Sequence, residues 1–180
     1  TLILKKQMQV LDAVTGGQDS VGIRISSHPI MQKVLQHFNG GLAAPSANRF
    51  GHISPSLAKH VKQSLGDKID LIIDGGATSI GIESTIIDCT QDHPRILRPG
   101  MITADEIEQI TNLAIAKNSE ATPRVSGDLK SHYAPSTKTF LVSVKELTKH
   151  IENSPSAVIM SRSKPNINKV IIHDARLPTR

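Results

Sequence analysis

The segment from Asp19 to Arg24 carries a hydroxyl at Ser20 and a guanidinium at Arg24, at alternate positions from the apolar residues Val21 and Ile23. On a strand, Ser20, Gly22 and Arg24 would share one face, because successive side chains point to opposite sides. Arg24 could then clamp a carboxylate with two hydrogen bonds, and the small Gly22 would leave room for a ligand. The alternative is a solvent-facing stripe in which Arg24 makes a surface ion pair.

A second polar cluster lies in the segment Ala44-Pro-Ser-Ala-Asn48 and continues to Ser54. Ser46 and Asn48 supply hydrogen-bond donors, and Asn48 would orient the loop. Ser54 is expected to cap a helix whose free N–H groups attract phosphate. The alternative is that this segment is a loop that ends in a good N-cap and binds no ligand, since Ser-Pro starts many helices.

A third cluster pairs the segment Glu83-Ser84-Thr85 with Arg98. Glu83, Ser84 and Thr85 lie at the start of a predicted strand and could contact a substrate. Alternatively, backbone groups of the turn could satisfy their polar atoms. Arg98 follows Ile96-Leu97 towards a sheet edge, where a guanidinium could bind a polyphosphate.

Features of covalent or metal-based catalysis are missing from the sequence. It contains no metal-ligand spacing, GxGxxG fingerprint, Walker loop or serine-nucleophile elbow. His28 and His52 are interpreted as turn and loop residues, and the single Cys89 as structural. The residue types therefore favour the binding of anions over covalent catalysis.

Composition narrows the class of protein further. The 180 residues are 38% hydrophobic, which excludes wholesale disorder, and no apolar run is long enough to cross a bilayer. The net charge of +5 favours anionic partners, with RNA among the possibilities. Aromatic residues make up only 2%, which argues against a base-stacking surface, and one cysteine suits a reducing, cytoplasmic location.

Periodicity predicts an α/β protein in which strands alternate with helices. Residues 1–118 would form the first domain, 119–138 a linker, and 139–180 the beginning of a smaller, parallel, Rossmann-like α/β domain. Strands are predicted at 1–5, 21–26, 70–74, 84–88, 95–97, 139–142, 157–160 and 169–173, and helices at 29–38, 55–65, 103–118 and 144–151. In the third of these helices, Ile107, Ile110 and Ala114 would point inwards.

The order of these motifs closely resembles the YrdC-like threonylcarbamoyl-AMP synthases. The resemblance covers nearly the whole chain, and His132-Tyr-Ala-Pro135 resembles the linker of the long, two-domain form of the family. The motifs that carry it are Thr15-Gly-Gly-Gln-Asp-Ser-Val-Gly-Ile-Arg24, Ala44-Pro-Ser-Ala-Asn48, Gly51-His-Ile-Ser-Pro55, Asp74-Gly-Gly76, Glu83-Ser-Thr85 and Arg98-Pro-Gly100.

The resemblance implies a fold with a twisted, mixed β-sheet and flanking helices. It also implies a nucleotidyltransferase that converts L-threonine, bicarbonate and ATP to threonylcarbamoyl-adenylate and pyrophosphate, with Mg²⁺ carried on the phosphates. A partner transferase then modifies tRNA next to the anticodon. By matching motif, threonine would be held by Arg24, Ala44 and Ser84. ATP would be held by Ser20, Ser46, Ser54 and Arg98, with Tyr133 as a lid and Asn48 in a secondary, loop-orienting role.

Three departures from the family pattern stand out. Ser20 replaces a common threonine and keeps the hydroxyl, whereas Phe50 stands where a small polar residue is common. The family's N-terminal segment, with a Lys-x-Arg phosphate-binding pair, is missing before Thr1. We therefore expect a chain that starts at Thr1 to be inactive by itself, and the activity to belong to an intact parent.

Two other classes of function remain open on the residues alone. A double-stranded RNA-binding module would use the net positive charge and need few aromatic residues. A non-catalytic sensor would bind threonine and nucleotide in the same pocket without releasing pyrophosphate.

Overall fold

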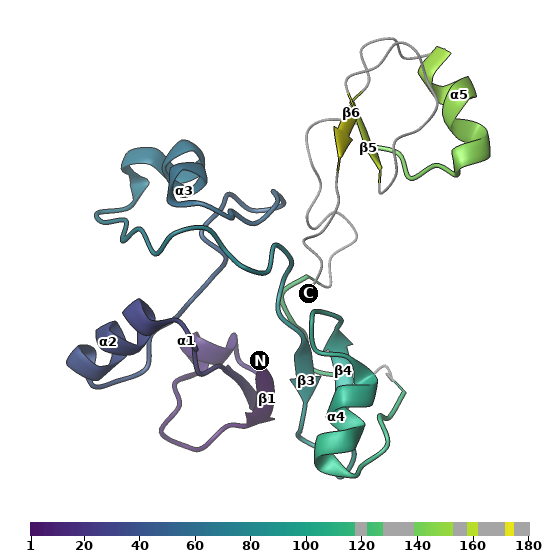
Figure 1. The fold of residues 1–180 in the computed structure, drawn as a ribbon. Coiled ribbons are helices and arrows are strands. Elements are labelled where there is room, and N and C mark those ends of the chain that lie inside the picture. The colour runs from purple at the N-terminus through teal and green to yellow at the C-terminus, as the bar shows by residue number, and fades with distance from the viewer. Residues whose placement is uncertain (118–121, 128–138, 153–157, 162–171, 175–180) are drawn as a thin grey trace. The chain divides into compact units, whose positions relative to one another are not determined.

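The computed structural model describes residues 1–117, 122–127, 139–152, 158–161 and 172–174 (Figure 1). The chain divides into two compact units, Thr1–Ser136 and Thr137–Arg180. The expected linker and the boundaries at 118 and 138 fall largely outside the described residues and stay predictions.

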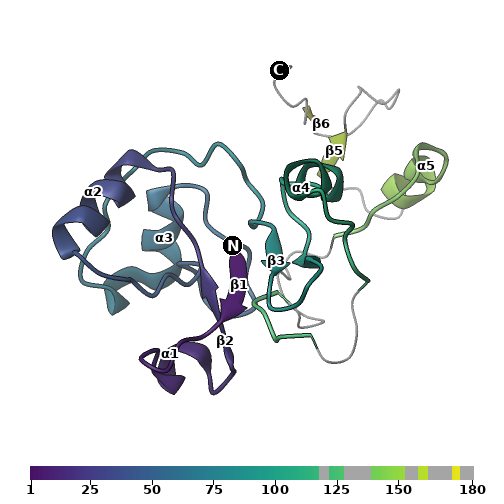
Figure 2. The same cartoon turned by 90° about the horizontal axis from the view of Figure 1, so that it is seen from below.

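A mixed four-stranded sheet forms the centre of the first unit. Its strands are β1 (Leu2–Lys5), β2 (Ser20–Ile23), β3 (Ile86–Asp88) and β4 (Arg95–Arg98), in the order β2-β1-β3-β4. Strand β1 pairs antiparallel with β2 and parallel with β3, and β3 pairs antiparallel with β4. Figure 2 shows β1 flanked by β2 and β3. The predicted mixed α/β sheet is confirmed.

The predicted strand at 70–74 is wrong, since these residues form no strand. Leu71 and Ile73 are 76% and 56% exposed, so their apolar character does not reflect burial here. An extended segment becomes a strand only when a neighbour accepts and donates its backbone hydrogen bonds. None of the described strands pairs with this segment.

Helix α2 (Pro29–Phe38) matches its predicted bounds. Pro29 stands in the first turn, where its missing N–H costs nothing, and Asn39 ends the helix in the left-handed region at φ 53°. A short helix, α1 (Asp12–Thr15), was not predicted, and it ends at Gly16 with φ 61°. Four residues are too few to carry a helical period.

Helix α3 (Ala58–Leu65) begins later than predicted and is followed by the 3₁₀ turn η1 (Gly66–Lys68). Leu57, not Ser54, occupies the N-cap position, and no side chain caps the helix. The expectation that Ser54 caps this helix is therefore wrong. The physical reason is that the Ser54 hydroxyl donates to Glu83 instead.

Helix α4 (Ala104–Thr111) has the predicted capping box: Thr103 Oγ1 accepts from Glu106 N, and the Glu106 carboxylate accepts from Thr103 N. Its predicted extension to residue 118 is wrong, because Asn112 adopts φ 54° and ends the helix. Ile107 is buried as expected, but Ile110 is 82% exposed. Ala114, also expected to point inwards, lies beyond the helix end and is exposed.

The second unit contains α5 (Val144–Glu152), β5 (Ile159–Ser161) and β6 (Ile172–Asp174). The strands β5 and β6 pair in parallel, as predicted, with Ile159 opposite Ile172. Residues 139–142 form no strand, which corrects the prediction there. Within the described ranges, no helix combines the length and apolar character needed to cross a bilayer.

Candidate functional site

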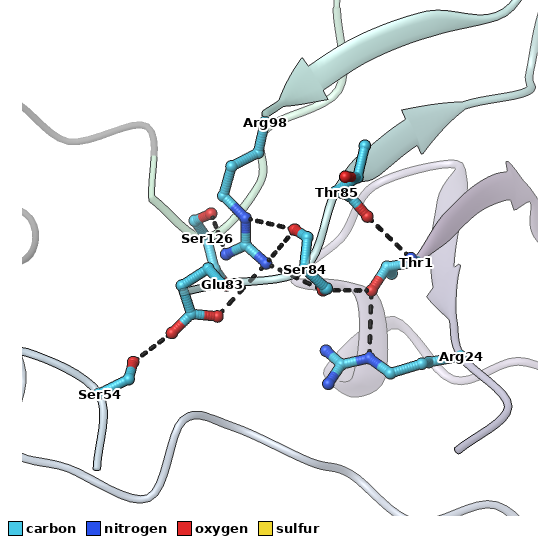
Figure 3. Close-up of polar contacts among 8 residues, drawn as sticks. All are labelled: Thr1, Arg24, Ser54, Glu83, Ser84, Thr85, Arg98 and Ser126. Carbon is cyan, nitrogen blue, oxygen red and sulfur yellow. Dashed lines mark hydrogen bonds and ion pairs between the residues drawn. The ribbon is translucent and has the colours of Figure 1, made fainter. Parts of the chain in front are cut away.

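The strand register brings Arg24 opposite Thr1, whose hydroxyl in turn contacts that of Ser84. Because Leu2 pairs with Ile23, the next residues outward on the two antiparallel strands face each other, and Arg24 Nε donates to Thr1 Oγ1 at 3.1 Å. On the other side of β1, the backbone N of Thr1 donates to Thr85 O at 2.9 Å. The Thr1 and Ser84 hydroxyls lie 3.2 Å apart (Figure 3).

Arg98 reaches the same place from the end of β4. Its Nε and Nη2 donate to the Ser84 carbonyl at 3.1 and 3.0 Å, and Nη2 also lies 3.3 Å from Ser84 Oγ. Nη1 donates to Ser126 O at 2.9 Å. The residue is 9% exposed, so this guanidinium is a buried cation fixed by carbonyl oxygens.

Ser54 joins the cluster through Glu83. The Ser54 hydroxyl donates to Glu83 Oε1, and Glu83 Oε2 lies 3.4 Å from Arg98 Nη2. Figure 3 shows an unbroken series of polar contacts from Arg24 through Thr1, Ser84, Arg98 and Glu83 to Ser54. We call this series the polar chain. It brings together residues assigned to threonine and residues assigned to ATP.

The loop that carries Ser84 is held against Gly100. A Cβ on Gly100 would lie 2.2 Å from Thr85 N and 2.7 Å from Glu83 O, so only glycine allows this close approach. Thr85, considered above as a substrate contact, is 3% exposed, and its hydroxyl bonds Ile102 O at 2.8 Å and Ile102 N at 3.1 Å. Thr85 is therefore a structural residue here.

The loop that carries Asn48 is organised by that side chain. Asn48 Nδ2 donates to Arg49 O at 2.8 Å and to His52 O at 3.0 Å, which is the geometry expected of a loop-orienting residue. Ala44 and Ser46 are exposed in the same irregular segment, and no described contact joins either to the polar chain.

The remaining candidate residues that the structure describes lie at other positions in the first unit. Ser20 begins β2 opposite Lys5, at the far end of the register from Arg24. Tyr133 and His132 lie outside the described residues. His28 precedes α2, and its Nε2 lies 3.3 Å from Gly75 O, so it connects two turns, while Phe50 is 81% exposed.

The sequence does not predict the contacts that Glu83 makes. It suggests a substrate contact, yet the Glu83 carboxylate binds Ser54 and Arg98, two of the residues assigned to ATP. Its sequence distance from them is 29 and 15 residues, so no local pattern indicates the contact. A lone acidic residue among anion-binding motifs was the available signal.

The comparisons define the class of protein. The Sua5/YciO/YrdC family profile, described as telomere recombination, matches residues 1–100, and the profile of the threonylcarbamoyl-AMP synthase C-terminal domain matches residues 102–177. The first match alone covers more than half of the chain. The chain belongs to the Sua5/YciO/YrdC family, which confirms the resemblance drawn from its motifs.

Two curated relatives are threonylcarbamoyl-AMP synthases. The protein from Pyrococcus abyssi is 41% identical over 147 residues, covering 79% of this chain and 43% of its own length. The protein from Schizosaccharomyces pombe is 40% identical over 138 residues, covering 71% of this chain and 34% of its own. The chain therefore spans less than half the length of these relatives.

Solved structures agree with the fold. The crystal structure of P. abyssi Sua5 complexed with L-threonine superposes with a TM-score of 0.78 at 34% identity, covering 96% of this chain and 55% of that one. A variant of the same protein, with a consecutive histidine and tyrosine replaced by alanine, gives a TM-score of 0.79 at 33% identity, covering 94% of this chain and 53% of that one.

Proposed function

We propose that this chain is part of a threonylcarbamoyl-AMP synthase that uses L-threonine, bicarbonate and ATP. The observation that carries the proposal is the polar chain, in which Ser84, assigned to threonine, contacts Arg98, assigned to ATP. Arg24, also assigned to threonine, joins the series through the Thr1 hydroxyl. The names of the curated relatives, and the L-threonine in the solved relative, support it.

The chemistry needs positioning more than a protein nucleophile. The threonine amine attacks CO2 derived from bicarbonate, which forms an N–C bond and releases a proton. A carbamate oxygen then attacks the α-phosphorus of ATP, and the bond from that phosphorus to pyrophosphate breaks. The anionic carbamate and the triphosphate must be held close together during these steps. Guanidinium and hydroxyl donors that offset their negative charge therefore lower the activation barrier.

The assigned roles follow this chemistry. Arg24, the backbone at Ala44, and Ser84 would hold threonine. Arg98 and Ser54 would offset charge on the phosphates, and Mg²⁺ carried on ATP would supply further positive charge there. Ser20 and Ser46 would complete the nucleotide contacts.

Tyr133 would close over the nucleotide from the linker. The chain contains a single tyrosine, and it follows His132. An adjacent histidine and tyrosine are the two residues replaced in the solved variant of P. abyssi Sua5, which supports a role for this pair. We infer that Tyr133→Phe would raise the KM for ATP and leave the KM for threonine unchanged.

The product would pass to a transferase that modifies tRNA next to the anticodon, and the location would be cytoplasmic. The lone cysteine and the net charge of +5 fit a reducing compartment and anionic partners.

Pyrophosphate release by the natural gene product that carries this chain tests the proposal. We expect release that requires ATP, threonine and bicarbonate together. Binding of threonine and ATP without release would indicate the sensor. Strong, steeply salt-dependent binding of duplex RNA with no effect of ATP would indicate the RNA-binding module.

A further inference from the structure

The segment 122–127 is bound to the rest of the first unit by side chains from two distant positions. It forms neither helix nor strand, so its peptide groups are not paired within a regular element. Within the described residues, its hydrogen bonds to the rest of the unit come from Gln18 and Arg98. The polar contacts that fix this segment therefore belong to these two side chains.

Gln18 binds both backbone groups of one residue, Arg124. Gln18 Oε1 accepts from Arg124 N at 2.8 Å, and Gln18 Nε2 donates to Arg124 O at 3.3 Å. A carboxamide has the same donor and acceptor as a peptide group, so the contact reproduces the paired hydrogen bonds of an antiparallel ladder. The two residues are 106 positions apart along the chain, so this contact closes a long loop.

The backbone on both sides of Gln18 is held in place. Gly17 adopts φ 78°, a conformation that favours glycine, and Gln18 N donates to Thr15 O at 3.4 Å. Asp19 O accepts from Lys6 N at 3.0 Å, immediately before β2 begins. The turn that precedes β2 thus presents the Gln18 carboxamide from a fixed position.

The bound segment meets the polar chain two residues after Arg124. There Ser126 O accepts from Arg98 Nη1 at 2.9 Å (Figure 3). Arg98 is buried, and Nε and Nη2 of the same guanidinium donate to the Ser84 carbonyl. Because Ser126 is so close to Arg124 in the chain, fixing the Arg124 peptide restricts where the Ser126 carbonyl can lie.

We propose that Gln18 is a positioning residue of the ATP site: its carboxamide docks the segment 122–127 on the first unit and thereby places the Ser126 carbonyl against Arg98. The assignment of Arg98 to ATP rests on the proposed function, whereas the docking contact does not.

Gln18→Met keeps the length of the side chain and removes both hydrogen bonds to Arg124. Because these bonds no longer oppose local opening, we expect trypsin to cut the Arg124–Val125 bond, which follows an exposed arginine, about 3–30-fold faster. The Kd for ATP should rise by a similar factor. The Kd for L-threonine should change by less than about twofold, because the Ser84 carbonyl keeps its two bonds to Arg98.

The test uses the natural gene product that carries this chain. Limited digestion with trypsin followed by mass spectrometry measures cleavage at Arg124–Val125, and calorimetric titration measures the binding of ATP and of L-threonine. Gln32→Met is the matched control, because Gln32 Nε2 also donates to a backbone carbonyl, that of Ser26, at 3.2 Å. This control should leave both the cleavage rate and ATP binding unchanged.

A second variant keeps the test decisive if Gln18→Met does not fold, which thermal melting establishes. Gln18→Glu retains an acceptor for Arg124 N but, when ionised, has no donor for Arg124 O. Its rate of cleavage at Arg124–Val125 should therefore exceed that of the wild type and remain below that of a variant lacking both bonds.

A double variant separates positioning from a general loss of stability. In an Arg98→Ala background, Gln18→Met should weaken ATP binding by less than about twofold, because its effect on the nucleotide acts through Arg98. A merely structural role would weaken ATP binding equally in the two backgrounds.

Other outcomes overturn the proposal. An unchanged cleavage rate in both Gln18 variants would mean that the carboxamide does not dock the segment. Faster cleavage with unchanged ATP binding, an equal effect in the Arg98→Ala background, or no ATP binding by the wild type would remove the positioning role. The proposed function fails by a different result, the absence of threonine-dependent pyrophosphate release, and the cleavage and binding measurements do not depend on turnover.

Discussion

Arg98 donates two hydrogen bonds to the backbone carbonyl of Ser84, from Nε at 3.1 Å and from Nη2 at 3.0 Å. Arg98, which is assigned to ATP, is therefore bound directly to Ser84, one of the residues assigned to threonine. Because Ser84 is part of the segment that precedes β3, the guanidinium also stabilises the shape of that segment. The two substrate sides are expected to respond together when Arg98 is changed.

Arg98→Ala should weaken the dependence of pyrophosphate release on ATP most strongly and on threonine to a lesser degree. Truncating one member of a buried, hydrogen-bonded charge pair costs about 2–5 kcal/mol in binding. Arg98→Lys keeps the charge but loses the fork on the Ser84 carbonyl, so it should restore only part of the affinity. The measurement is steady-state kinetics with each substrate varied in turn.

Lys62→Ala, on the exposed side of α3, is the control for a general loss of positive charge. Equal effects of Lys62→Ala and Arg98→Ala, or unchanged ATP kinetics in Arg98→Ala, would remove Arg98 from the site.

Arg24→Ala should raise the KM for threonine with little change in the KM for ATP. Arg24 is exposed, and its described contact is the neutral hydroxyl of Thr1 at 3.1 Å. A loss of about 2–5 kcal/mol, expected from the sequence if this residue formed a buried charge pair, does not fit that exposure. An exposed pair with the threonine carboxylate is worth about 1 kcal/mol or less, a few-fold change in KM. An effect confined to ATP would contradict the assignment.

Gly100→Ala should destabilise the first unit. The added Cβ would lie 2.2 Å from Thr85 N and 2.7 Å from Glu83 O, both backbone atoms that cannot rotate away. Overpacking of this kind costs roughly 1–3 kcal/mol or more. Gly81→Ala is the matched control, because its Cβ would meet nothing within 4 Å. Equal thermal melting of the two variants would show that the Gly100 contact is dispensable.

Thr103→Ala should lower the free energy of unfolding by about 1 kcal/mol, because it removes the hydroxyl that accepts from Glu106 N. Gln109→Ala, at an exposed position within the same helix, should change it by no more than about 0.5 kcal/mol. Urea denaturation measures both. A Thr103→Ala variant as stable as Gln109→Ala would mean that α4 does not need its cap.

Cys89 should react more slowly with alkylating agents in the folded protein than in the urea-unfolded one. Partial desolvation raises the pKa of this exposed thiol above its ordinary value, and the Asp88 carboxylate raises the pKa further. The reactive thiolate then forms at higher pH in the folded state. The rate of alkylation is measured against pH for both states, and it should rise at a higher pH in the folded protein than in the unfolded one. The opposite order would contradict a structural, unactivated cysteine.

Local signals were read correctly where a few neighbouring residues determine the structure. Pro29 and Asn39 bound α2, the pair Thr103 and Glu106 begins α4, and alternation along β2 identifies a strand. Each of these depends on hydrogen bonds or side-chain directions within one or two turns of chain. The motif order also identified the family, which the family profile confirms.

Errors arose where a distant partner changed the result. Ser54 has the type and spacing of a helix cap, but its hydroxyl bonds Glu83, and the helix begins at Ala58. Residues 70–74 have the composition of a strand, but no described strand pairs with them. Local preference in both cases is worth about 1 kcal/mol, which a single tertiary contact can outweigh.

The amino-acid sequence by itself determined the residue types of the site, the class of sheet and the family. Only the tertiary structure decided that Arg24, Ser84, Arg98 and Ser54 meet in one series of contacts, and that Glu83 stands between the last two. The physical reason is chain closure. Thr1 and Ser84 are 83 residues apart, and their contact depends on the joint register of β2, β1 and β3, which no short segment specifies.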